Sequence, residues 1–357
     1  MTLSMPAEWE PHQATWIAWP HNVGDWPGRF GPLPWVFADI VKKLAEGETV
    51  RLLVNDAAHQ ARARRHLERN GANLARVDFR RIPTDRVWTR DSGPIVIRKT
   101  GPRGGGAGTD GRAVAGFRFN AWAKYRDWKR DARVPERAAR ALGLPLLPVR
   151  RAGRDVVLEG GAIDVNGAGS ILATEECLLD PAVQVRNPGF ARADYEAVFR
   201  DALGAPNAIW LGKGIAGDDT HGHVDDLARF VSPSTIVLAR ENDPGDANHL
   251  ALAENRERLA SARLADGSRP QVVDLPMPRP VTFAGRRLPA SYANFYIGNA
   301  VVLVPTFNDA ADRAALGILG ELFPDRQVVG IHALDLVWGL GTLHCMTQQE
   351  PRETIGA

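Results

Sequence analysis

The chain alternates short apolar segments with longer segments in which apolar residues recur every three or four positions. The short segments are rich in valine, isoleucine and leucine, and their lengths are typical of β-strands. They span residues 50–54, 94–97, 113–119, 156–158, 170–173, 235–239, 300–304 and 327–331. We therefore predict strands along the whole length of the chain.

The longer segments have the periodicity of amphipathic α-helices. They span residues 33–46, 56–70, 135–142, 191–203, 247–265 and 310–322. Asn55, Asp246 and Asp309 are candidate N-caps, and Gly71 and Gly204 are candidate C-caps. The alternation predicts a mixed α/β fold. The helices recur at intervals of roughly 50 to 60 residues, as repeated βαβ-type units would, although no residue-level repeat is visible.

One segment between two predicted strands is rich in glycine. Residues 101–111 read Gly-Pro-Arg-Gly-Gly-Gly-Ala-Gly-Thr-Asp-Gly, a composition that predicts a mobile hairpin tip. The segment is too short to connect two domains. We therefore expect a single domain over residues 1–357.

Composition excludes several classes of protein. The 44% hydrophobic and 24% charged fractions are those of a soluble globular protein, and 44 basic against 42 acidic residues leave no excess charge to bind nucleic acid or anionic lipid. Cys177 and Cys345 cannot form a disulfide framework. The N-terminal residues lack the features of a signal peptide, and no apolar run approaches the ~20 residues of a membrane helix. We expect a cytoplasmic protein that binds neither membranes nor nucleic acid.

Residues 217–230 concentrate carboxylates and imidazoles. Their sequence is Gly-Asp-Asp-Thr-His-Gly-His-Val-Asp-Asp-Leu-Ala-Arg-Phe. The ionisable side chains at its centre are Asp218, Asp219, His221, His223, Asp225 and Asp226. A solvated surface would be the simplest explanation, but such a surface rarely interleaves glycine and histidine with its carboxylates before an apolar run. The pattern favours a functional site.

Cys345 is a candidate nucleophile. It follows the glycine-bearing segment Trp-Gly-Leu-Gly-Thr-Leu-His at residues 338–344, and glycine allows a substrate to approach the backbone closely. The alternative is a small buried hydrophobic side chain, but the polar neighbours of Cys345 favour partial ionisation of the thiol. In an extended segment, His344 would point away from Cys345. We therefore expect the base to be His223.

Two further carboxylates stand beside predicted strands. Asp91 lies in Val-Trp-Thr-Arg-Asp-Ser-Gly-Pro at residues 87–94, and Glu159 lies in Leu-Glu-Gly-Gly-Ala-Ile-Asp at residues 158–164. Either acid could face a pocket. The alternatives are an Asx turn at Asp91 and a β-bulge with an exposed acid at Glu159.

Three interpretations of these groups compete. The first is a zinc-dependent hydrolase with His221, His223 and Asp225 as ligands, because the Thr-His-Gly-His-Val-Asp run partly matches that of metallo-β-lactamase-type enzymes. The second is a thiol hydrolase that uses Cys345 and His223 on an acyl group, which leaves the many carboxylates unexplained.

The third interpretation is an enzyme that acts on a guanidinium group. A guanidinium ion is planar, cationic and carries five N–H donors, so that two carboxylates such as Asp91 and Asp225 would hold it selectively. Its central carbon is a poor electrophile and requires a strong nucleophile held in line. Cys345 would supply that nucleophile.

Several motifs together resemble the agmatine deiminase family, whose members are bacterial peptidyl-arginine deiminase-like proteins of the guanidine-modifying superfamily. The motifs are Trp-Thr-Arg-Asp-Ser-Gly-Pro at 88–94, Glu-Gly-Gly at 159–161, Gly-Asp-Asp-Thr-His-Gly-His-Val-Asp at 217–225, Pro-Ala-Ser-Tyr-Ala-Asn-Phe-Tyr-Ile at 289–297 and His-Cys-Met-Thr-Gln-Gln at 344–349. The opening residues 5–12 are also similar. The resemblance implies a five-bladed α/β propeller (pentein) of repeated ββαβ-like units around a central active site, within one guanidine-modifying catalytic domain, and no metal or organic cofactor.

The resemblance also implies catalytic roles. Cys345 would be the nucleophile, and His223 the general acid and base. Asp91 and Asp225 would hold the guanidinium group, and Glu159 would be a further active-site carboxylate. The implied reaction converts agmatine to N-carbamoylputrescine and ammonia through a covalent amidino intermediate on Cys345, as a step of putrescine and polyamine biosynthesis.

Substrate specificity stays open at this stage. By resemblance, Asp219 would face the far amine of the substrate and Trp88 would form an aromatic wall. His221, Asp226 and the segment from Leu340 to Leu343 differ from the residues usual in the family. Arginine, peptidyl-arginine or another guanidino compound are alternative substrates, although no arginine in the motifs is placed to bind a carboxylate. An amidinotransferase would share the covalent step. The resemblance to the family and the frequency of homodimers among soluble enzymes also favour a homodimer.

Overall fold

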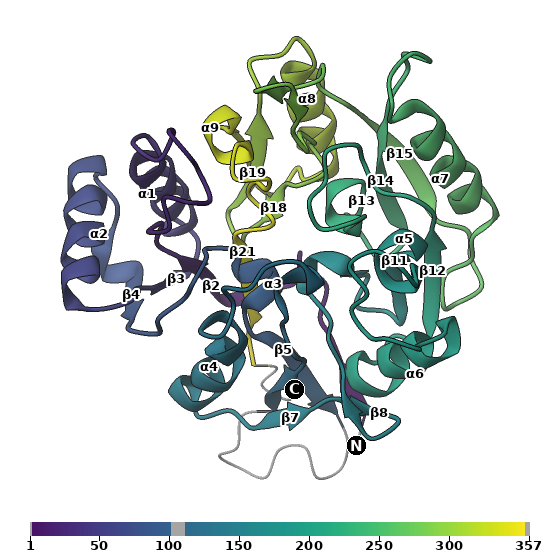
Figure 1. Ribbon diagram of the computed structural model, residues 1–357, viewed down its shortest axis with the longest axis horizontal. Helices are drawn as coiled ribbons and strands as arrows, with labels where there is room; N and C mark the ends of the chain where they lie inside the picture. Colours follow the sequence, from purple (N-terminus) through teal and green to yellow (C-terminus); the bar gives the residue numbers. More distant parts are fainter. Residues whose placement is uncertain (1, 101–110, 354–357) are drawn as a thin grey trace.

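The fold is described by a computed structural model that covers residues 2–100 and 111–353 (Figure 1). The predicted hairpin tip at residues 101–111 lies, except for its last residue, outside these described residues. Within them the chain is a mixed α/β protein, as the sequence predicts.

Most strands belong to five sheets of three or four strands. The first contains, in spatial order, β21 (Thr347–Pro351), β2 (His12–Ala18), β3 (Thr49–Leu53) and β4 (Val77–Arg80). The second contains β1 (Thr2–Ser4), β5 (Ile95–Thr100), β6 (Arg112–Gly116) and β7 (Leu146–Pro148). The third contains β10 (Asp164–Val165), β11 (Ser170–Thr174) and β12 (Asn207–Leu211). The fourth contains β13 (Ala228–Phe230), β14 (Thr235–Arg240) and β15 (Gln271–Pro276). The fifth contains β18 (Tyr296–Ile297), β19 (Val301–Thr306) and β20 (Gln327–His332).

Helices connect the parallel strands of these sheets. The longer helices are α1 (Leu33–Leu44), α2 (Ala57–Asn70), α4 (Val134–Leu142), α6 (Arg192–Leu203), α7 (His249–Ser261) and α8 (Ala311–Leu322). The shorter α-helices are α3 (Thr89–Ser92), α5 (Glu175–Leu179) and α9 (Leu334–Val337). The 3-10 turns are η1 (Leu74–Arg76), η2 (Ala121–Ala123), η3 (Asp131–Arg133), η4 (Gly160–Ala162) and η5 (Val224–Asp226). Two small ribbons pair β8 (Arg150–Arg151) with β9 (Arg154–Asp155), and β16 (Thr282–Phe283) with β17 (Arg286–Arg287).

All five sheets share one connection pattern. An antiparallel pair of strands is followed by a helix and then by a strand parallel to the second member of the pair. In the fourth sheet, for example, Val237 of β14 pairs with Arg229 in the antiparallel direction and with Val273 in the parallel direction. Parallel strands require such a crossover connection. Figure 1 shows the five sheets following one another around the molecule in chain order, with the longer helices on the outside.

The first sheet is completed by the last strand of the chain. β21 pairs with β2 in the antiparallel direction, with Thr347 opposite Ile17. Cys345 lies two residues before β21, a strand that Figure 1 shows in the inner part of the molecule. The ends of the chain therefore jointly position the residue on which the candidate chemistry depends.

The six predicted helices are confirmed, with small differences at their ends. Gly71 and Gly204 end α2 and α6 in the left-handed conformation, at φ values of 71° and 66°, which glycine adopts without strain. The predicted N-caps were wrong by one or two residues. Asp56 rather than Asn55 caps α2 through His59 N, because its side chain is the one in reach of the first turn. The N-cap positions of α7 and α8 are Asn248 and Ala310, because a turn stabilised by the preceding aspartate leads into each helix.

The strand predictions were less complete. Residues 156–158 do not form a strand and contribute only an isolated bridge between Arg118 and Val157. The predicted strand at 113–119 ends at Gly116, where β6 ends. β21 was missed because its sequence, Thr-Gln-Gln-Glu-Pro, is polar although all five residues are buried. Within the described part of the chain, no helix is both long enough and apolar enough to span a bilayer.

Candidate active site

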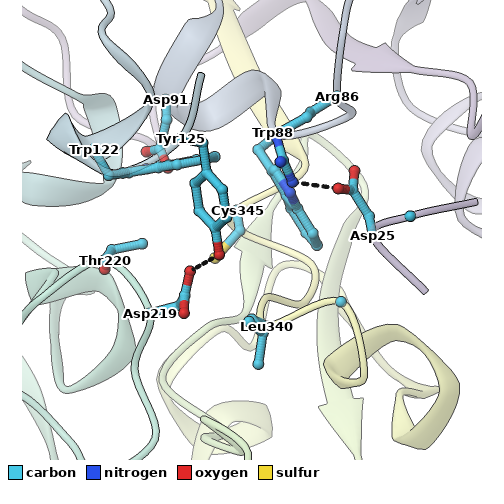
Figure 2. Close-up of a pocket in the computed structure, with 12 residues that line it drawn as sticks. Asp25, Arg86, Trp88, Asp91, Trp122, Tyr125, Asp219, Thr220, Leu340 and Cys345 are labelled. Carbon is cyan, nitrogen blue, oxygen red and sulfur yellow. Dashed lines mark hydrogen bonds and ion pairs between the residues drawn. The ribbon is translucent and has the colours of Figure 1, made fainter. Parts of the chain in front are cut away.

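Cys345 lines a pocket together with residues from several distant segments of the chain (Figure 2). Only 7% of its surface is exposed. The other residues around this pocket are Gly24, Asp25, Arg86, Trp88, Asp91, Trp122, Tyr125, Asp219, Thr220, Gly339 and Leu340. Three of the residues predicted from the sequence, Trp88, Asp91 and Asp219, therefore share one pocket with the predicted nucleophile.

The glycines before Cys345 allow the segment to pass close to aromatic side chains. A Cβ at Gly341 would lie 2.8 Å from the Trp88 ring and 3.1 Å from Cys345 Cβ, and a Cβ at Gly339 would lie 2.5 Å from the Trp26 ring. Atoms do not approach so closely without displacement. Glycine at these positions lets the segment seat Cys345 against the Trp88 wall of the pocket.

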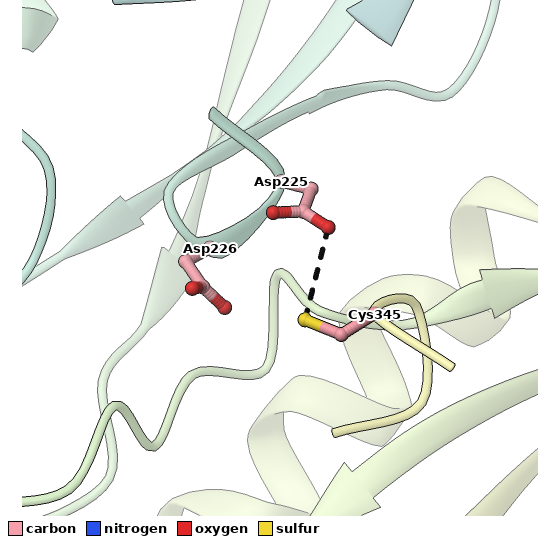
Figure 3. A group of neighbouring side chains, drawn as sticks. All are labelled: Asp225, Asp226 and Cys345. Carbon is pink, nitrogen blue, oxygen red and sulfur yellow. Dashed lines mark hydrogen bonds between the residues drawn. The ribbon is translucent and has the colours of Figure 1, made fainter. Parts of the chain in front are cut away.

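Two consecutive carboxylates of η5 face the thiol (Figure 3). Cys345 Sγ lies 3.9 Å from Asp225 Oδ2. Burial, together with the negative charges of Asp225, Asp226 and Asp91, raises the pKa of Cys345 well above its ordinary value. Burial and the adjacent Asp225 also raise the pKa of Asp226. Burial and these carboxylates therefore disfavour the thiolate, and a cation bound beside them would favour it.

Asn294 is a polar contact of the thiol to which sequence reasoning gave no role. Its Nδ2 donates to Cys345 Sγ at 3.1 Å and to Asp226 Oδ1 at 3.0 Å. Its Oδ1 accepts from Thr342 Oγ1 at 2.7 Å and from His344 N at 3.1 Å. These bonds to the carbonyl oxygen fix the orientation of the amide, so that its N–H groups point at the sulfur. An asparagine within the run Tyr-Ala-Asn-Phe-Tyr at residues 292–296 was the available signal, because a buried amide needs partners.

His223 and Asp91 lie side by side around Gly161. His223 Nδ1 is 3.8 Å from Asp91 Oδ1 and 4.0 Å from Asp225 Oδ1. Asp91 accepts hydrogen bonds from Gly161 N at 3.0 Å and from Trp122 Nε1 at 2.8 Å. A Cβ at Gly161 would lie 2.6 Å from His223 Nδ1 and 2.8 Å from Asp91 Oδ1. The Glu-Gly-Gly motif thus supplies a position where only glycine fits between the imidazole and the carboxylate.

Burial and neighbouring charges shift the pKa values of both His223 and Asp91. Burial alone would lower the pKa of His223, but Asp91, Cys177 and Asp225 raise it well above its ordinary value of 6.5. Burial raises the pKa of Asp91 to about 6, although His223 and the Trp122 hydrogen bond act in the opposite direction. At neutral pH the imidazole is therefore protonated and can donate a proton.

Glu159 lies behind this group rather than on the pocket wall. It is fully buried, and its Oε1 accepts from Arg186 Nε at 3.0 Å. Arg186 also donates to the backbone carbonyl oxygen of Thr220 at 2.6 Å. Glu159 therefore anchors an arginine that holds the segment leading to His223.

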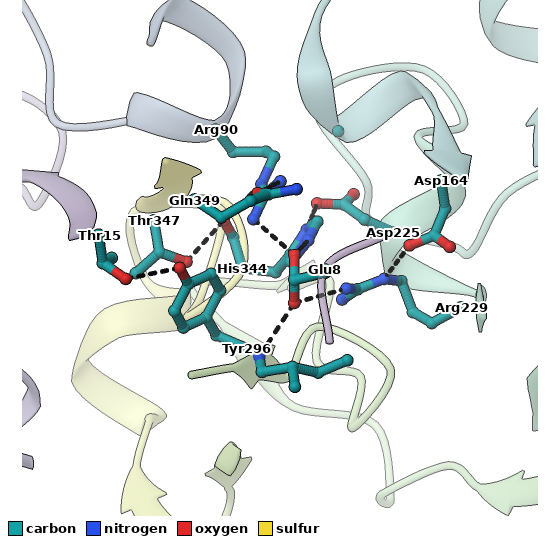
Figure 4. A network of polar contacts seen from close by, with 12 residues as sticks. Glu8, Thr15, Arg90, Asp164, Asp225, Arg229, Tyr296, His344, Thr347 and Gln349 are labelled. Atoms are coloured by element: carbon teal, nitrogen blue, oxygen red, sulfur yellow. Dashed lines mark hydrogen bonds and ion pairs between the residues drawn. The ribbon is translucent and has the colours of Figure 1, made fainter. Parts of the chain in front are cut away.

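A buried ionic network contacts Asp225 through His344 (Figure 4). His344 Nδ1 lies 2.6 Å from Asp225 Oδ2, and His344 Nε2 lies 2.8 Å from Glu8 Oε2. Glu8 also accepts from Arg90 and Arg229, each at 2.8 Å. The pKa of Glu8 is held well below its ordinary value, because Arg229, His344 and Arg90 outweigh the effect of burial.

His344 is consequently a link between two carboxylates. The pKa of Asp225 is also lowered, since its bond to His344 outweighs burial. The two ring nitrogens of His344 contact one oxygen of each carboxylate, at 2.6 Å and 2.8 Å. The sequence prediction that His344 would not serve Cys345 as a base agrees with these contacts. The ring bridges Glu8 and Asp225, the latter a predicted guanidinium-binding carboxylate.

Asp219 lies at the outer end of the pocket. Its Oδ2 accepts from the Tyr125 hydroxyl, and its Oδ1 accepts from Lys124 Nζ at 2.7 Å and from Arg286 Nη2 at 2.8 Å. The Trp88 ring packs against the Trp26 ring, with centroids 5.5 Å apart and the ring planes tilted by 40°. Sequence reasoning missed Lys124, Tyr125 and Arg286 because they lie outside the motifs.

The residues of the zinc interpretation are not assembled. His221 Nε2 points away to Asp180 Oδ2 at 2.8 Å. Among the described residues, the one group of three metal-ligating side chains with ligand atoms within 4.8 Å of one another is Asp225, Asp226 and Cys345, and it contains neither histidine. His221, His223 and Asp225 therefore do not form the proposed ligand set.

Comparison with known proteins shows similarity along nearly the whole chain. The model of the Porphyromonas-type peptidyl-arginine deiminase family matches residues 4–351. Agmatine deiminase of Ectopseudomonas mendocina is 34% identical, over 97% of this chain and 95% of that protein. The structure of agmatine deiminase of Enterococcus faecalis superposes with a TM-score of 0.88 at 29% identity, covering 99% of this chain and 97% of that one. A C. jejuni agmatine deiminase with substrate bound gives a TM-score of 0.83 at 26% identity, covering 98% and 97%.

Proposed function

Because this chain belongs to the agmatine deiminase family, we propose that it hydrolyses the guanidinium group of agmatine to give N-carbamoylputrescine and ammonia. The observation that carries the proposal is the meeting of Cys345, His223, Asp91 and Asp225 in one buried group. Two carboxylates match the charge and the donors of a guanidinium ion, and the thiol lies beside them.

Binding of the substrate prepares the nucleophile. The guanidinium charge offsets Asp91 and Asp225, which together with burial raise the pKa of Cys345. The thiol pKa therefore falls when the substrate enters, the thiol releases its proton to solvent, and the Asn294 amide stabilises the thiolate as a hydrogen-bond donor. The nucleophile is formed only where its electrophile is already held.

The first half of the reaction releases ammonia. The thiolate of Cys345 forms a C–S bond with the guanidinium carbon and gives a tetrahedral adduct. Protonated His223 transfers its proton to one terminal nitrogen, the C–N bond breaks and ammonia departs. The amidino group remains on sulfur as a cation, whose charge Asp91 and Asp225 continue to balance.

The second half releases the ureido product. Neutral His223 takes a proton from a water molecule, which forms a C–O bond with the amidino carbon. Collapse of this adduct breaks the C–S bond and returns the thiolate and protonated His223. The remaining hydroxyl proton passes to ammonia, so the products are N-carbamoylputrescine and ammonium ion.

The other predicted residues take supporting roles. Trp88 forms a wall beside Cys345, with which it shares the pocket. Glu159 acts through Arg186 on the segment that carries His223. Asp219 faces the far end of the substrate. The same arrangement could be completed by an amine instead of water, which would be amidino transfer, and the product distinguishes the two.

The test is an assay of chelator-treated protein with agmatine. We expect ureido product and ammonia in equal amounts, at a rate that chelation does not change. An activity lost with chelator and restored by zinc would contradict the thiol mechanism. A requirement for an added amine acceptor would indicate transfer rather than hydrolysis.

The pH dependence should be bell-shaped, with an acidic limb near pH 6. Asp91, whose pKa burial raises to about 6, becomes protonated below that pH and no longer balances the guanidinium charge.

At high pH, His223 loses its proton and with it the ability to protonate the leaving nitrogen. Its pKa is raised by Asp91, Cys177 and Asp225 against burial, so this limb should lie above 6.5. Initial rates that yield kcat/KM from about pH 5 to about pH 10 check both limbs, because kcat/KM reports the groups of the free enzyme. An alkaline limb at or below 6.5 would contradict the assignment.

The repeated connection pattern supports a finer description of the fold. We propose that the five sheets are the blades of an α/β propeller with the pocket at its centre, and that residues 1–357 form one catalytic domain. We further propose a cytoplasmic homodimer that supplies a step of putrescine biosynthesis and binds no nucleic acid. The balanced charge of the chain supports the last point.

A further inference from the structure

Trp122 lines the pocket beside Asp91, although none of the sequence motifs contains it (Figure 2). The side chain is buried, and its indole Nε1 donates to Asp91 Oδ2 at 2.8 Å. The other oxygen of this carboxylate, Oδ1, accepts from Gly161 N at 3.0 Å. Each oxygen of Asp91 therefore has one buried N–H donor.

These two donors fix the plane of the Asp91 carboxylate. A carboxylate offers about four acceptor positions, so two remain for a guanidinium group that donates in pairs. A donor on each oxygen prevents rotation about the Cβ–Cγ bond, and the two remaining positions keep one orientation. Without the indole, Gly161 N alone would hold the group, and the plane of the carboxylate could turn.

The backbone that carries Trp122 has an unfavourable conformation. Ala121, Trp122 and Ala123 have φ values of 53°, 58° and 53°. Residues such as alanine and tryptophan rarely adopt this left-handed region, and where they do the surrounding structure imposes it, often at a functional site. Asn120 Oδ1 accepts from Ala123 N at 2.9 Å and closes the turn. This turn places the indole against Asp91.

Gln184 holds the same turn through the backbone of Trp122. Its Nε2 donates to the carbonyl oxygen of Trp122 at 3.2 Å and to that of Asp219 at 3.1 Å. One amide thus ties the turn to the segment of Asp219 and Thr220, which also line the pocket. The position of Trp122 is therefore fixed from both its backbone and its side chain.

Resting on the proposed deimination, we propose that Trp122 is a positioning residue of the reaction, whose indole N–H holds the Asp91 carboxylate in the orientation that receives the guanidinium group. The same hydrogen bond favours the ionised form of Asp91, because a donor stabilises the charge that it contacts. Trp122 acts through Asp91 and takes no part in proton transfer or bond formation.

The charge of Asp91 depends on several groups besides the indole. The titratable groups that face it are His223, Asp225, Asp226, Glu159 and Cys345. Burial raises the pKa of Asp91 to about 6, and Asp225 and Glu159 act in the same direction, whereas His223 and the Trp122 hydrogen bond act against burial. Loss of the indole N–H should therefore raise the pKa of Asp91 further while the other groups stay in place.

The first test is the pH profile of kcat/KM for agmatine in Trp122→Phe. Phenylalanine keeps an aromatic wall and removes the donor, so the acidic limb should move up from near pH 6 by about one pH unit. Relative to wild type, the variant should lose about fivefold more activity at about pH 6 than at about pH 8, because more of Asp91 is protonated. A role in packing alone would lower activity equally at both pH values.

Trp26→Phe is the matched control. Trp26 is buried beside Trp88, and its Nε1 donates to the backbone carbonyl oxygen of Leu336 at 3.0 Å. The substitution removes an indole donor near the pocket that serves a carbonyl rather than a carboxylate. The acidic limb of this variant should stay near pH 6, even if its rate falls.

A spectroscopic measurement tests the hydrogen bond without turnover. In protein with isotope-labelled tryptophan, the indole N–H signal of Trp122 is identified by its absence in Trp122→Phe, or in Trp122→Tyr if the first variant does not fold. We expect this signal to titrate with a midpoint near pH 6 in the wild type, because its acceptor Asp91 titrates there. The step should be absent in Asp91→Asn.

The outcomes separate this proposal from the proposed function. An acidic limb that Trp122→Phe leaves in place, or an indole signal that does not titrate, would overturn the role of Trp122 while deimination stands. A wild-type protein without agmatine turnover at any pH would overturn deimination and the role of Trp122 in it. A limb that moves in Trp122→Phe but not in Trp26→Phe, together with the titrating signal, would establish Trp122 as a positioning residue.

Discussion

Replacement of Cys345 by alanine is expected to lower kcat for agmatine by at least about 10³-fold, because no other side chain can form the covalent intermediate. The thiol lies against Asp225 and Asn294, where the guanidinium carbon would be presented to it. The measurement is the initial rate of ureido product formation, together with mass spectrometry of acid-quenched enzyme. Wild-type protein should carry an amidino adduct on Cys345, and the variant should carry none.

The loss must be shown to be chemical rather than structural. Alanine removes one buried sulfur, so the free energy of unfolding should fall by only about 1 kcal/mol. Asp91 and Asp225 remain, and calorimetric titration of the variant with agmatine should still show binding. Cys345→Ser should behave in the same way, since a hydroxyl is a much weaker nucleophile than a thiolate. Retained turnover in either variant would refute the covalent mechanism and reopen a role for activated water.

The sequence predicted the helices well because each has one apolar face. In α1, for example, Phe37, Ile40, Val41 and Leu44 are buried at helical spacing. β21 shows the limit of this reasoning. Some of its buried polar side chains have distant partners, such as Gln349, which accepts from Arg90, and Glu350, which accepts from Trp16. Periodicity cannot reveal a buried polar strand, because the partners come from elsewhere in the chain.

The candidate site likewise contains residues that the sequence predicted and contacts that it could not predict. The motifs contained the groups expected to touch the guanidinium, and Cys345, His223, Asp91 and Asp225 do come together in space. Their catalytic roles stay predictions until they are measured. The supporting contacts of Asn294 could not be read from the sequence, because they depend on which segments meet in the fold. The same holds for the outer end of the pocket, where side chains from separate segments meet at one carboxylate.

Glu8→Gln is expected to lower the free energy of unfolding by about 3–5 kcal/mol at neutral pH. Glu8 belongs to the buried network that contacts Asp225 through His344. The side chain is 5% exposed and contacts Arg90, Arg229 and His344. Glutamine has nearly the same shape but no charge, so the buried Arg90 and Arg229 would lose the carboxylate that they share and His344 would lose a charged partner. Urea unfolding followed by tryptophan fluorescence measures the change.

The pH dependence of this loss gives the decisive control. Arg229, His344 and Arg90 hold the pKa of Glu8 well below 4.5, even against burial. Its stabilising contribution is therefore complete above pH 4.5 and is lost as the pH falls toward the pKa of the folded state. The difference in unfolding free energy between wild type and Glu8→Gln should shrink on acidification.

The control is Glu254→Gln, which breaks an exposed pair with Arg258 and should lower the free energy of unfolding by at most about 1 kcal/mol. A loss in Glu8→Gln no larger than in this control would mean that the network contributes little to stability. In that case His344 would hold Asp225 without the help of Glu8.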